Sequence, residues 1–248
     1  MPVYGQIIIH TEVPIGGRCT LTGMSYESLM LWGPRIGQAF TIITASGFRL
    51  RARVTSLGPE SAELVAFEDA GIISAVHPEI TLLQALPEKE RMELIIQKTA
   101  ELGVDRIMPL KTKRSTTLEE RDSFQKKAMK WQRVALKASI QSRRDSIPEV
   151  LPYTTISCAI EANKEADIKI ALWERPGLGL FRDLAAGFAV KAIKRAAVLV
   201  GPEGGFDEEE MAVAKGAGFV PVSLGQNILR TETAAIISVG LLRHYLGE

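Results

Sequence analysis

The 248 residues, 46% of them hydrophobic and 24% charged, have the composition of an ordinary globular protein of one or two domains. The formal net charge is only +1, and the two cysteines and three scattered histidines fit neither a disulfide framework nor a metal site, so we expect no metal. No run approaches the roughly 20 apolar residues of a membrane-spanning helix and no signal peptide is recognisable, so we expect a cytoplasmic protein without a membrane partner.

The first 72 residues predict a small β domain. Runs of β-branched or alternating apolar residues are separated by turns, and strands are expected over 3–9, 40–44, 48–54 and 62–67. The run FRLRARV at 48–54 alternates strictly and places Arg49, Arg51 and Arg53 on one face. From the residues alone, this face is either a solvated outer surface or a contact for RNA phosphates.

The next segment predicts the start of a second domain, with a boundary near 73–78 at a linker that contains Pro78. A strand is expected over 80–85, an amphipathic helix over 88–102 and a second strand over 104–110. Gly103 is expected directly after the helix, where glycine commonly ends a helix.

The region 111–144 has a local excess of positive charge, with 11 basic residues and three acidic ones. A helix is expected at about 122–142, with an apolar stripe that includes Trp131 and Ala135. Another face carries only cations: Lys126, Lys130, Arg133 and Lys137. Because like charges four residues apart destabilise a helix, we favour an RNA phosphate-binding surface over a merely solvated face.

Three strand ends in the last third of the chain predict a ligand pocket. The strand over 167–174 ends at Glu174, and short strands over 197–200 and 220–224 each run into a glycine-containing loop and then a helix. Ligands collect at the carboxyl ends of parallel strands, so we expect these ends to meet in an α/β fold with a parallel sheet.

The helices that follow two of these loops have recognisable starts. Asp207 and Glu210 predict a capping box, and Thr231 is expected to cap the last helix with Glu232 in its first turn.

The two loops read LVGPEGGF at 199–206 and LGQNILRTETA at 224–234. Together they resemble the SPOUT-class methyltransferases of the RsmE type, which methylate N3 of a uridine in small-subunit ribosomal RNA. The stretch at 89–110 and the QSRRDSIPEV segment at 141–150, where Gln141, Arg144 and Pro148 align, extend the resemblance over about 74–248. It implies a trefoil-knotted SPOUT domain over 74–248, an RNA-binding PUA-like β-barrel over 1–73, and a homodimer.

The resemblance also implies S-adenosylmethionine as methyl donor. Glycines in both loops leave room for close approach of a ligand, beside apolar side chains that suit an adenosine. The residues expected to bind the donor are Leu172, Glu174, Leu199, Gly201, Pro202, Gly204, Gly205, Leu224, Gly225, Ile228, Leu229 and Thr231. Ribosomal RNA, or the small ribosomal subunit, is the expected partner, and Gln141 and Arg144 join the basic residues above as expected RNA contacts.

Four side chains are candidates for catalysis. Negative charge develops on the base as the uridine N3 proton leaves, and Arg230 is the cation placed to stabilise it. Glu203, Glu232 and Glu174 are candidates for the general base or for orienting Arg230, and the sequence does not choose among them.

Two departures from the family pattern keep other functions open. The segment 25–38 lacks a histidine and a basic end that the family shows, and Ile140 and Arg143 stand where the family tends to have Glu and Gly. A related methyltransferase with another RNA target and a non-catalytic RNA-binding assembly protein therefore remain alternatives.

Overall fold

The structure is a computed structural model, and it describes residues 6–9, 11–46, 48–72, 77–87, 89–116, 124–142, 144, 146–188 and 193–247. The chain divides into two compact units, Met1–Val76 with Ser139–Ile147, and His77–Ala138 with Pro148–Glu248. None of the helices within the described ranges is both long enough and apolar enough to cross a membrane.

The first unit contains a five-stranded sheet with the strand order β1-β3-β4-β5-β2. Its elements are β1 (Gln6–Ile8), β2 (Arg18–Thr22), α1 (Gly23–Leu31), β3 (Ala39–Ile43), β4 (Phe48–Leu57) and β5 (Ser61–Ile72). β1 and β3 pair in parallel, and the other pairs are antiparallel. The strands expected from Phe40 onward are confirmed; the start of the strand expected at Val3 lies outside the described residues. The sequence did not predict β2 or α1.

Strand β4 has the alternation that its sequence predicts. Leu50, Ala52 and Val54 are buried, whereas Arg49, Arg51 and Arg53 are half-buried or exposed. The three arginines therefore share the outer face of the sheet, and the guanidinium of Arg53 lies 5.2 Å from the centre of the Phe67 ring on β5.

The second unit is built on a parallel sheet with the order β12-β10-β11-β6-β7-β8, and β9 also pairs with β7. Its strands are β6 (Glu79–Ala85), β7 (Arg106–Lys111), β8 (Glu149–Val150), β9 (Thr154–Thr155), β10 (Ile168–Leu172), β11 (Arg195–Val200) and β12 (Val220–Val222). Every pairing among them is parallel, so the predicted α/β class with a parallel sheet is confirmed.

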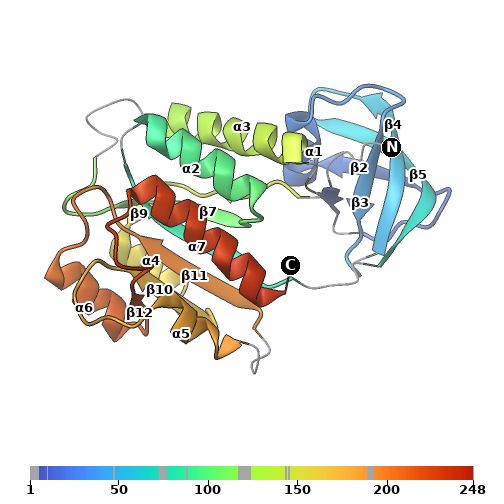
Figure 1. Cartoon of the computed structure of the whole chain (residues 1–248). Coiled ribbons are helices and arrows are strands. Elements are labelled where there is room, and N and C mark those ends of the chain that lie inside the picture. Colours follow the sequence, from blue (N-terminus) through green and yellow to red (C-terminus); the bar gives the residue numbers. More distant parts are fainter. Residues whose placement is uncertain are drawn as a thin grey trace. The chain divides into compact units, whose positions relative to one another are not determined.

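Helices cover both faces of this sheet (Figure 1). They are α2 (Lys89–Glu101), α3 (Phe124–Ser142), α4 (Ile156–Ala162), α5 (Phe181–Ala185), α6 (Glu208–Gly216) and α7 (Thr231–Leu246). α2 and α7 pack side by side on one face, and α4 and α6 lie on the other. Successive residues of β11 alternate between the two cores: Val198 and Val200 face α2 and α7, and Ala197 and Leu199 face α4 and α6.

The basic helix expected at about 122–142 is present as α3, and its apolar stripe is buried at Trp131, Ala135 and Ala138. The predicted helix at 88–102 is present as α2. Gly103 follows it with a φ of 97°, the left-handed conformation that glycine adopts without strain.

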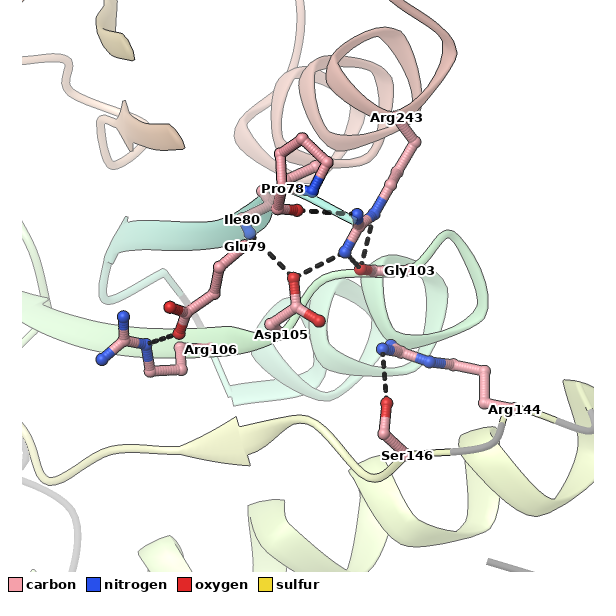
Figure 2. A network of polar contacts seen from close by, with 9 residues as sticks. All are labelled: Pro78, Glu79, Ile80, Gly103, Asp105, Arg106, Arg144, Ser146 and Arg243. Atoms are coloured by element: carbon pink, nitrogen blue, oxygen red, sulfur yellow. Dashed lines mark hydrogen bonds and ion pairs between the residues drawn. The ribbon is translucent and has the colours of Figure 1, made fainter. Parts of the chain in front are cut away.

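A buried arginine fastens α7 to the amino ends of β6 and β7 (Figure 2). Arg243 is only 6% exposed, and it donates hydrogen bonds to the carbonyl oxygens of Pro78 and Gly103, each at 2.8 Å. It also pairs with Asp105 at 2.5 Å, and the same carboxylate oxygen accepts from the backbone N–H of Ile80 at 2.8 Å. The last helix is thus joined to two sheet strands that lie far away in the sequence.

Candidate active site

A pocket of about 980 Å³ opens at the carboxyl ends of β10, β11 and β12 in the second unit. Three segments line most of it: residues 172–178 after β10, residues 200–206 between β11 and α6, and residues 222–231 between β12 and α7. The three strand ends that the sequence analysis grouped therefore do meet. This is the edge at which parallel α/β sheets bind ligands, and the volume is at the upper end for small-molecule sites.

All but one of the residues expected to bind the donor line this pocket. They are Leu172, Glu174, Gly201, Pro202, Gly204, Gly205, Leu224, Gly225, Ile228, Leu229 and Thr231. The exception is Leu199, whose side chain is fully buried in the core against α6 and does not line the pocket. The reason is the alternation of β11, which turns Val200 to the pocket side and Leu199 to the opposite face.

The loop after β11 turns tightly before it enters α6. The N–H of Gly205 donates to the carbonyl of Pro202 at 2.9 Å, and Gly205 has a φ of 67°. The predicted capping box is confirmed: the Glu210 N–H donates to Asp207 at 2.8 Å, and the Asp207 N–H donates to Glu210 at 3.0 Å. The start of α6 therefore fixes where the loop ends.

The expectation that Thr231 caps α7 is wrong, because Arg230 occupies the N-cap position and Thr231 is already in the helix. The Thr231 hydroxyl donates instead to the carbonyl of Gly201 at 2.6 Å. It also accepts a hydrogen bond from the fully buried Gln84 side chain of β6 at 3.0 Å. The hydroxyl thus ties the first turn of α7 to the β11 loop and to the central strand.

The loop after β12 is held at its start and projects at its tip. The Ser223 hydroxyl donates to the carbonyl of Gly225 at 2.8 Å, and the Ser223 N–H donates to the carbonyl of Gly179 at 3.0 Å. Further along, Ile228 lines the pocket with 82% of its surface exposed.

Arginines that were not predicted as site residues line the pocket. Arg91 of α2 pairs with Glu203 at 2.9 Å, and Arg114, from the loop after β7, donates to the carbonyl of Gly204 at 2.8 Å. Both line the pocket together with Arg230, the predicted catalytic cation. The basic stretch at 111–144 was a signal for Arg114. No pattern in the sequence pointed to Arg91, because its contact with Glu203 joins segments that are 112 residues apart.

The neighbouring Lys113 locks the loop after β7 onto α6. Its ammonium lies 2.6 Å from Asp207 and 2.5 Å from Glu209, and its backbone N–H donates to Glu210 at 2.7 Å. These carboxylates hold the pKa of Lys113 above its usual value, and Lys113 in turn lowers the pKa of Asp207, helped by the Glu210 N–H. Arg114 therefore sits in a loop whose position is fixed.

The acidic candidates are placed differently. Glu174 and Glu203 line the pocket, and Glu203 is engaged by Arg91. Glu232 lies in the first turn of α7 as expected, but its side chain does not line the pocket. Its Oε2 atom is buried and has no hydrogen-bond partner within the described part of the chain. Glu174 and Glu203 are therefore better placed than Glu232 for the role of general base, because only these two line the pocket.

The predicted RNA-binding residues fall into two groups. On α3, Arg133 and Lys137 are exposed, whereas Lys130 pairs with Glu93 at 2.6 Å, and the side chain of Lys126 lies outside the described residues. Near the end of α3, Gln141 is exposed and Arg144 donates to Ser146 at 3.3 Å; Arg143 is outside the described residues. The other group, Arg49, Arg51 and Arg53, lies on the outer face of β4 in the first unit.

Where the structure describes the chain, no three His, Cys, Asp or Glu side chains cluster closely enough to hold a metal ion. The polar side chains of the pocket are instead four arginines, the carboxylates of Glu174 and Glu203, and the uncharged Ser223, Gln226, Asn227 and Thr231. Such a set can bind anions and stabilise negative charge by hydrogen bonding and electrostatic attraction.

A family model for an RNA methyltransferase domain matches residues 75–243. A relative from Synechocystis, described as ribosomal RNA small subunit methyltransferase E, is 31% identical over 249 aligned residues, which cover 97% of this chain and 78% of that protein. A relative from Buchnera aphidicola with the same description is 30% identical over 169 residues, covering 68% of this chain but only 64% of that protein's length.

Two solved structures are similar along nearly the whole chain. Ribosomal RNA small subunit methyltransferase E from Neisseria gonorrhoeae, bound to S-adenosyl methionine, has a TM-score of 0.68 and 26% identity, with 97% of each chain covered. A methyltransferase from Legionella pneumophila in complex with the cofactor SAM has a TM-score of 0.68 and 27% identity, again with 97% of each chain covered.

Proposed function

We propose that this chain, which belongs to the RNA methyltransferase domain family, transfers a methyl group from S-adenosylmethionine to N3 of a uridine in small-subunit ribosomal RNA. The observation that carries the proposal is the pocket at the carboxyl ends of β10, β11 and β12, which lies within the matched residues and is rimmed by arginines. The names of the relatives and the S-adenosylmethionine bound in the Neisseria structure support the substrate and the donor.

The residues of the pocket fit this donor. Leu172, Val200, Val222, Leu224 and Leu229 supply apolar walls of the kind that surround an adenosine, and the adjacent glycines expose main-chain groups. Glu174 supplies a carboxylate at the same wall, suited to a ribose hydroxyl or to a cationic group. When bound, S-adenosylmethionine supplies an electrophilic methyl group, and the reaction needs no metal.

Besides binding the donor, the protein must stabilise the negative charge that develops on the base and accept the N3 proton. As the N3 proton leaves, negative charge spreads onto the two neighbouring carbonyl oxygens of the uracil. Arg230 lines the pocket at the N-cap of α7, and we expect its guanidinium to stabilise that charge. Glu174 and Glu203 are the carboxylates on the pocket wall and thus the candidates for accepting the proton.

The basic faces supply the surface that an RNA substrate needs. Arg133 and Lys137 on α3, and Arg49, Arg51 and Arg53 on β4, are expected to contact phosphates, and the first unit would act as a PUA-like RNA-binding domain. We also propose that the protein acts in the cytoplasm. Replacing Arg49 and Arg53 by alanine should weaken RNA binding; unchanged affinity and salt dependence would remove the β4 face from the proposal.

We further propose a trefoil knot and a homodimer. After β12 pairs at the sheet edge, the chain must return past β10 and β11, since Thr231 bonds to Gly201 and Gln84. Threading of 223–230 through the neighbouring loops would make the knot, and an experimental structure of these segments tests it.

Exposed Ile228 and Ile237 offer apolar surface to a second copy, and a monomeric mass in light scattering would contradict the dimer.

The deciding experiment is nucleoside mass spectrometry of ribosomal RNA from a strain lacking the protein. We expect one N3-methyluridine to disappear from small-subunit RNA and to return with the wild-type gene but not with an Arg230→Ala variant. Loss of a different modified nucleoside would favour the alternative of another RNA target. Purified protein that binds neither S-adenosylmethionine nor S-adenosylhomocysteine would contradict methyl transfer altogether.

A further inference from the structure

The pocket holds more positive charge than its proposed donor can use. Four arginines line it, Arg91, Arg114, Arg175 and Arg230, against only two acids, Glu174 and Glu203. S-adenosylmethionine itself carries a sulfonium and an ammonium group with a single carboxylate, so it is a net cation. A surplus of arginines around a cation is repulsive unless a polyanion shares the site.

Two of these arginines already have other roles. Arg175 pairs with Glu208, and its guanidinium lies 5.1 Å from the centre of the Trp173 ring, so it serves the wall of the pocket. Arg230 is the cation proposed to act on the base. Arg91 and Arg114 are left, and nothing in the proposed chemistry of the donor or of the base requires them.

Arg91 and Arg114 approach the same loop from different elements. The Nη1 atom of Arg91 lies 2.9 Å from Glu203, and the Nη1 atom of Arg114 lies 2.8 Å from the carbonyl oxygen of the next residue, Gly204. Each of these contacts uses one nitrogen of a guanidinium that carries five N–H donors. Two guanidinium groups therefore lie next to adjacent residues at the pocket, and each has N–H donors that these contacts do not use.

Both side chains are positioned before any ligand arrives. Gly204 permits the approach of Arg114, because a Cβ atom there would lie 3.1 Å from the Cβ atom of Arg114. The loop of Arg114 is locked by Lys113 onto Asp207 and Glu210. Arg91 is about one-third exposed and is oriented by Glu203. Prior ordering of this kind reduces the entropy lost when an anion binds.

From this geometry we infer that Arg91 and Arg114 form a phosphate clamp that holds the RNA backbone next to the base to be methylated, with Glu203 as a positioning residue that orients Arg91. The inference rests on the proposed function and names the substrate contact of the same site. Arginine forks match phosphate oxygens and fix the position of a nucleic acid without reading its sequence. In this arrangement Glu203 orients Arg91, and Glu174 is the other carboxylate on the pocket wall that can accept the proton.

The test compares Arg91→Ala and Arg114→Ala with Lys98→Ala, a matched control that removes an ion-paired cation elsewhere on α2. Calorimetry with S-adenosylhomocysteine reports the donor site. Binding to single-stranded oligouridine over a salt series reports phosphate contacts, and methylation of small ribosomal subunits gives kcat and KM. Thermal unfolding confirms that each variant is folded, and Arg114→Lys tests whether a point charge restores part of the binding.

We expect each arginine variant to bind S-adenosylhomocysteine within about twofold of wild type while the log–log salt slope for RNA falls by roughly 0.7 per lost contact. KM for the ribosomal subunit should rise about tenfold with a smaller change in kcat, and Lys98→Ala should match wild type. A tenfold loss of S-adenosylhomocysteine affinity with an unchanged salt slope would overturn the inference, since the arginines would then hold the loop or the donor carboxylate.

Glu203→Gln separates positioning from proton transfer. A positioning role predicts a raised KM for the ribosomal subunit with kcat and its pH profile nearly preserved. A general base predicts a fall in kcat of about 10²-fold or more and loss of the acidic limb of the profile, which would overturn the assignment of Glu203. Failure of the proposed function looks different from either outcome, because the wild-type protein itself would then neither bind the donor nor methylate RNA.

Discussion

Arg243 near the end of α7 and Asp105, the residue directly before β7, form an ion pair of 2.5 Å although they are 138 positions apart in the chain. The two residues meet because α7 packs against α2, which brings the last turns of α7 to the amino ends of the sheet strands (Figure 2). The pair lies at the edge opposite to the pocket, which is at the carboxyl ends of the strands. It should therefore contribute to stability rather than to catalysis.

The first prediction follows from this burial. Arg243→Leu removes the cation that pairs with Asp105 and the side-chain donor to the carbonyl groups of Pro78 and Gly103, and losing the buried partner of such a pair costs about 3 kcal/mol. Urea unfolding measures this loss of unfolding free energy, provided that the m value, the slope against urea concentration, is the same for both proteins. His244→Ala, an exposed neighbour on the same helix, is the control and should change the free energy of unfolding little. Equal stabilities for the two variants would contradict the role of the network.

The second prediction concerns the hydroxyl of Thr231. Thr231→Val keeps the shape of the side chain but removes the donor to the Gly201 carbonyl and one acceptor of the Gln84 amide, at a cost of about 1–3 kcal/mol for the buried groups. Because Gly201 lines the pocket, affinity for S-adenosylhomocysteine should fall as well. Thr233→Val, two residues further along the helix, is the matched control. Calorimetry that finds the same affinity for both variants would show that the hydroxyl does not shape the pocket.

The sequence was informative wherever a local pattern determined the structure. The alternation of β4, the capping box of Asp207 and Glu210, and the apolar stripe of α3 each depend on spacing within one element, and each was predicted correctly. The motif pair around Gly201 and Gly225 also identified the family that the matches show.

Contacts between distant segments could not be predicted in the same way. The N-cap preference of threonine suggested a cap at Thr231, but tertiary bonds to Gly201 and Gln84 take its hydroxyl. The pairing of Arg91 with Glu203 depends on how α2 and the β11 loop are brought together, which no local spacing encodes. Leu199 and Val200 are both apolar, and only the observed face of β11 separates the core residue from the pocket residue.

The third prediction concerns acid stability. Lys113 lowers the pKa of Asp207 below its ordinary value of 3.8, so the charged form of Asp207 contributes stability above that pH and loses it as the pH falls through the lower folded value. Asp207→Asn keeps a capping side chain but removes the charge. The difference in free energy of unfolding between wild type and variant should therefore be largest at neutral pH and shrink below pH 3.8. Asp183→Asn, which does not touch Lys113, serves as the control, and a pH-independent difference for Asp207→Asn would contradict the pairing.

The last prediction separates RNA binding from chemistry. Arg133→Ala and Lys137→Ala on α3 should each weaken binding of any RNA and lower the log–log salt slope by roughly 0.7–0.9, because each removes one phosphate contact. Lys130→Ala should have a smaller effect, since Lys130 is already paired with Glu93. None of the three should change the affinity for S-adenosylhomocysteine.

Arg230→Ala should behave in the opposite way. It should leave the salt slope nearly intact and reduce turnover by about 10²-fold or more, because its guanidinium is expected to stabilise charge that develops only in the transition state. Salt-series binding and single-turnover methylation of the same RNA measure the two effects on one set of proteins. If the α3 variants kept both the affinity and the salt slope of wild type, the basic face of α3 would be a solvated surface, and RNA recognition would have to lie with the arginines of β4 and those at the pocket.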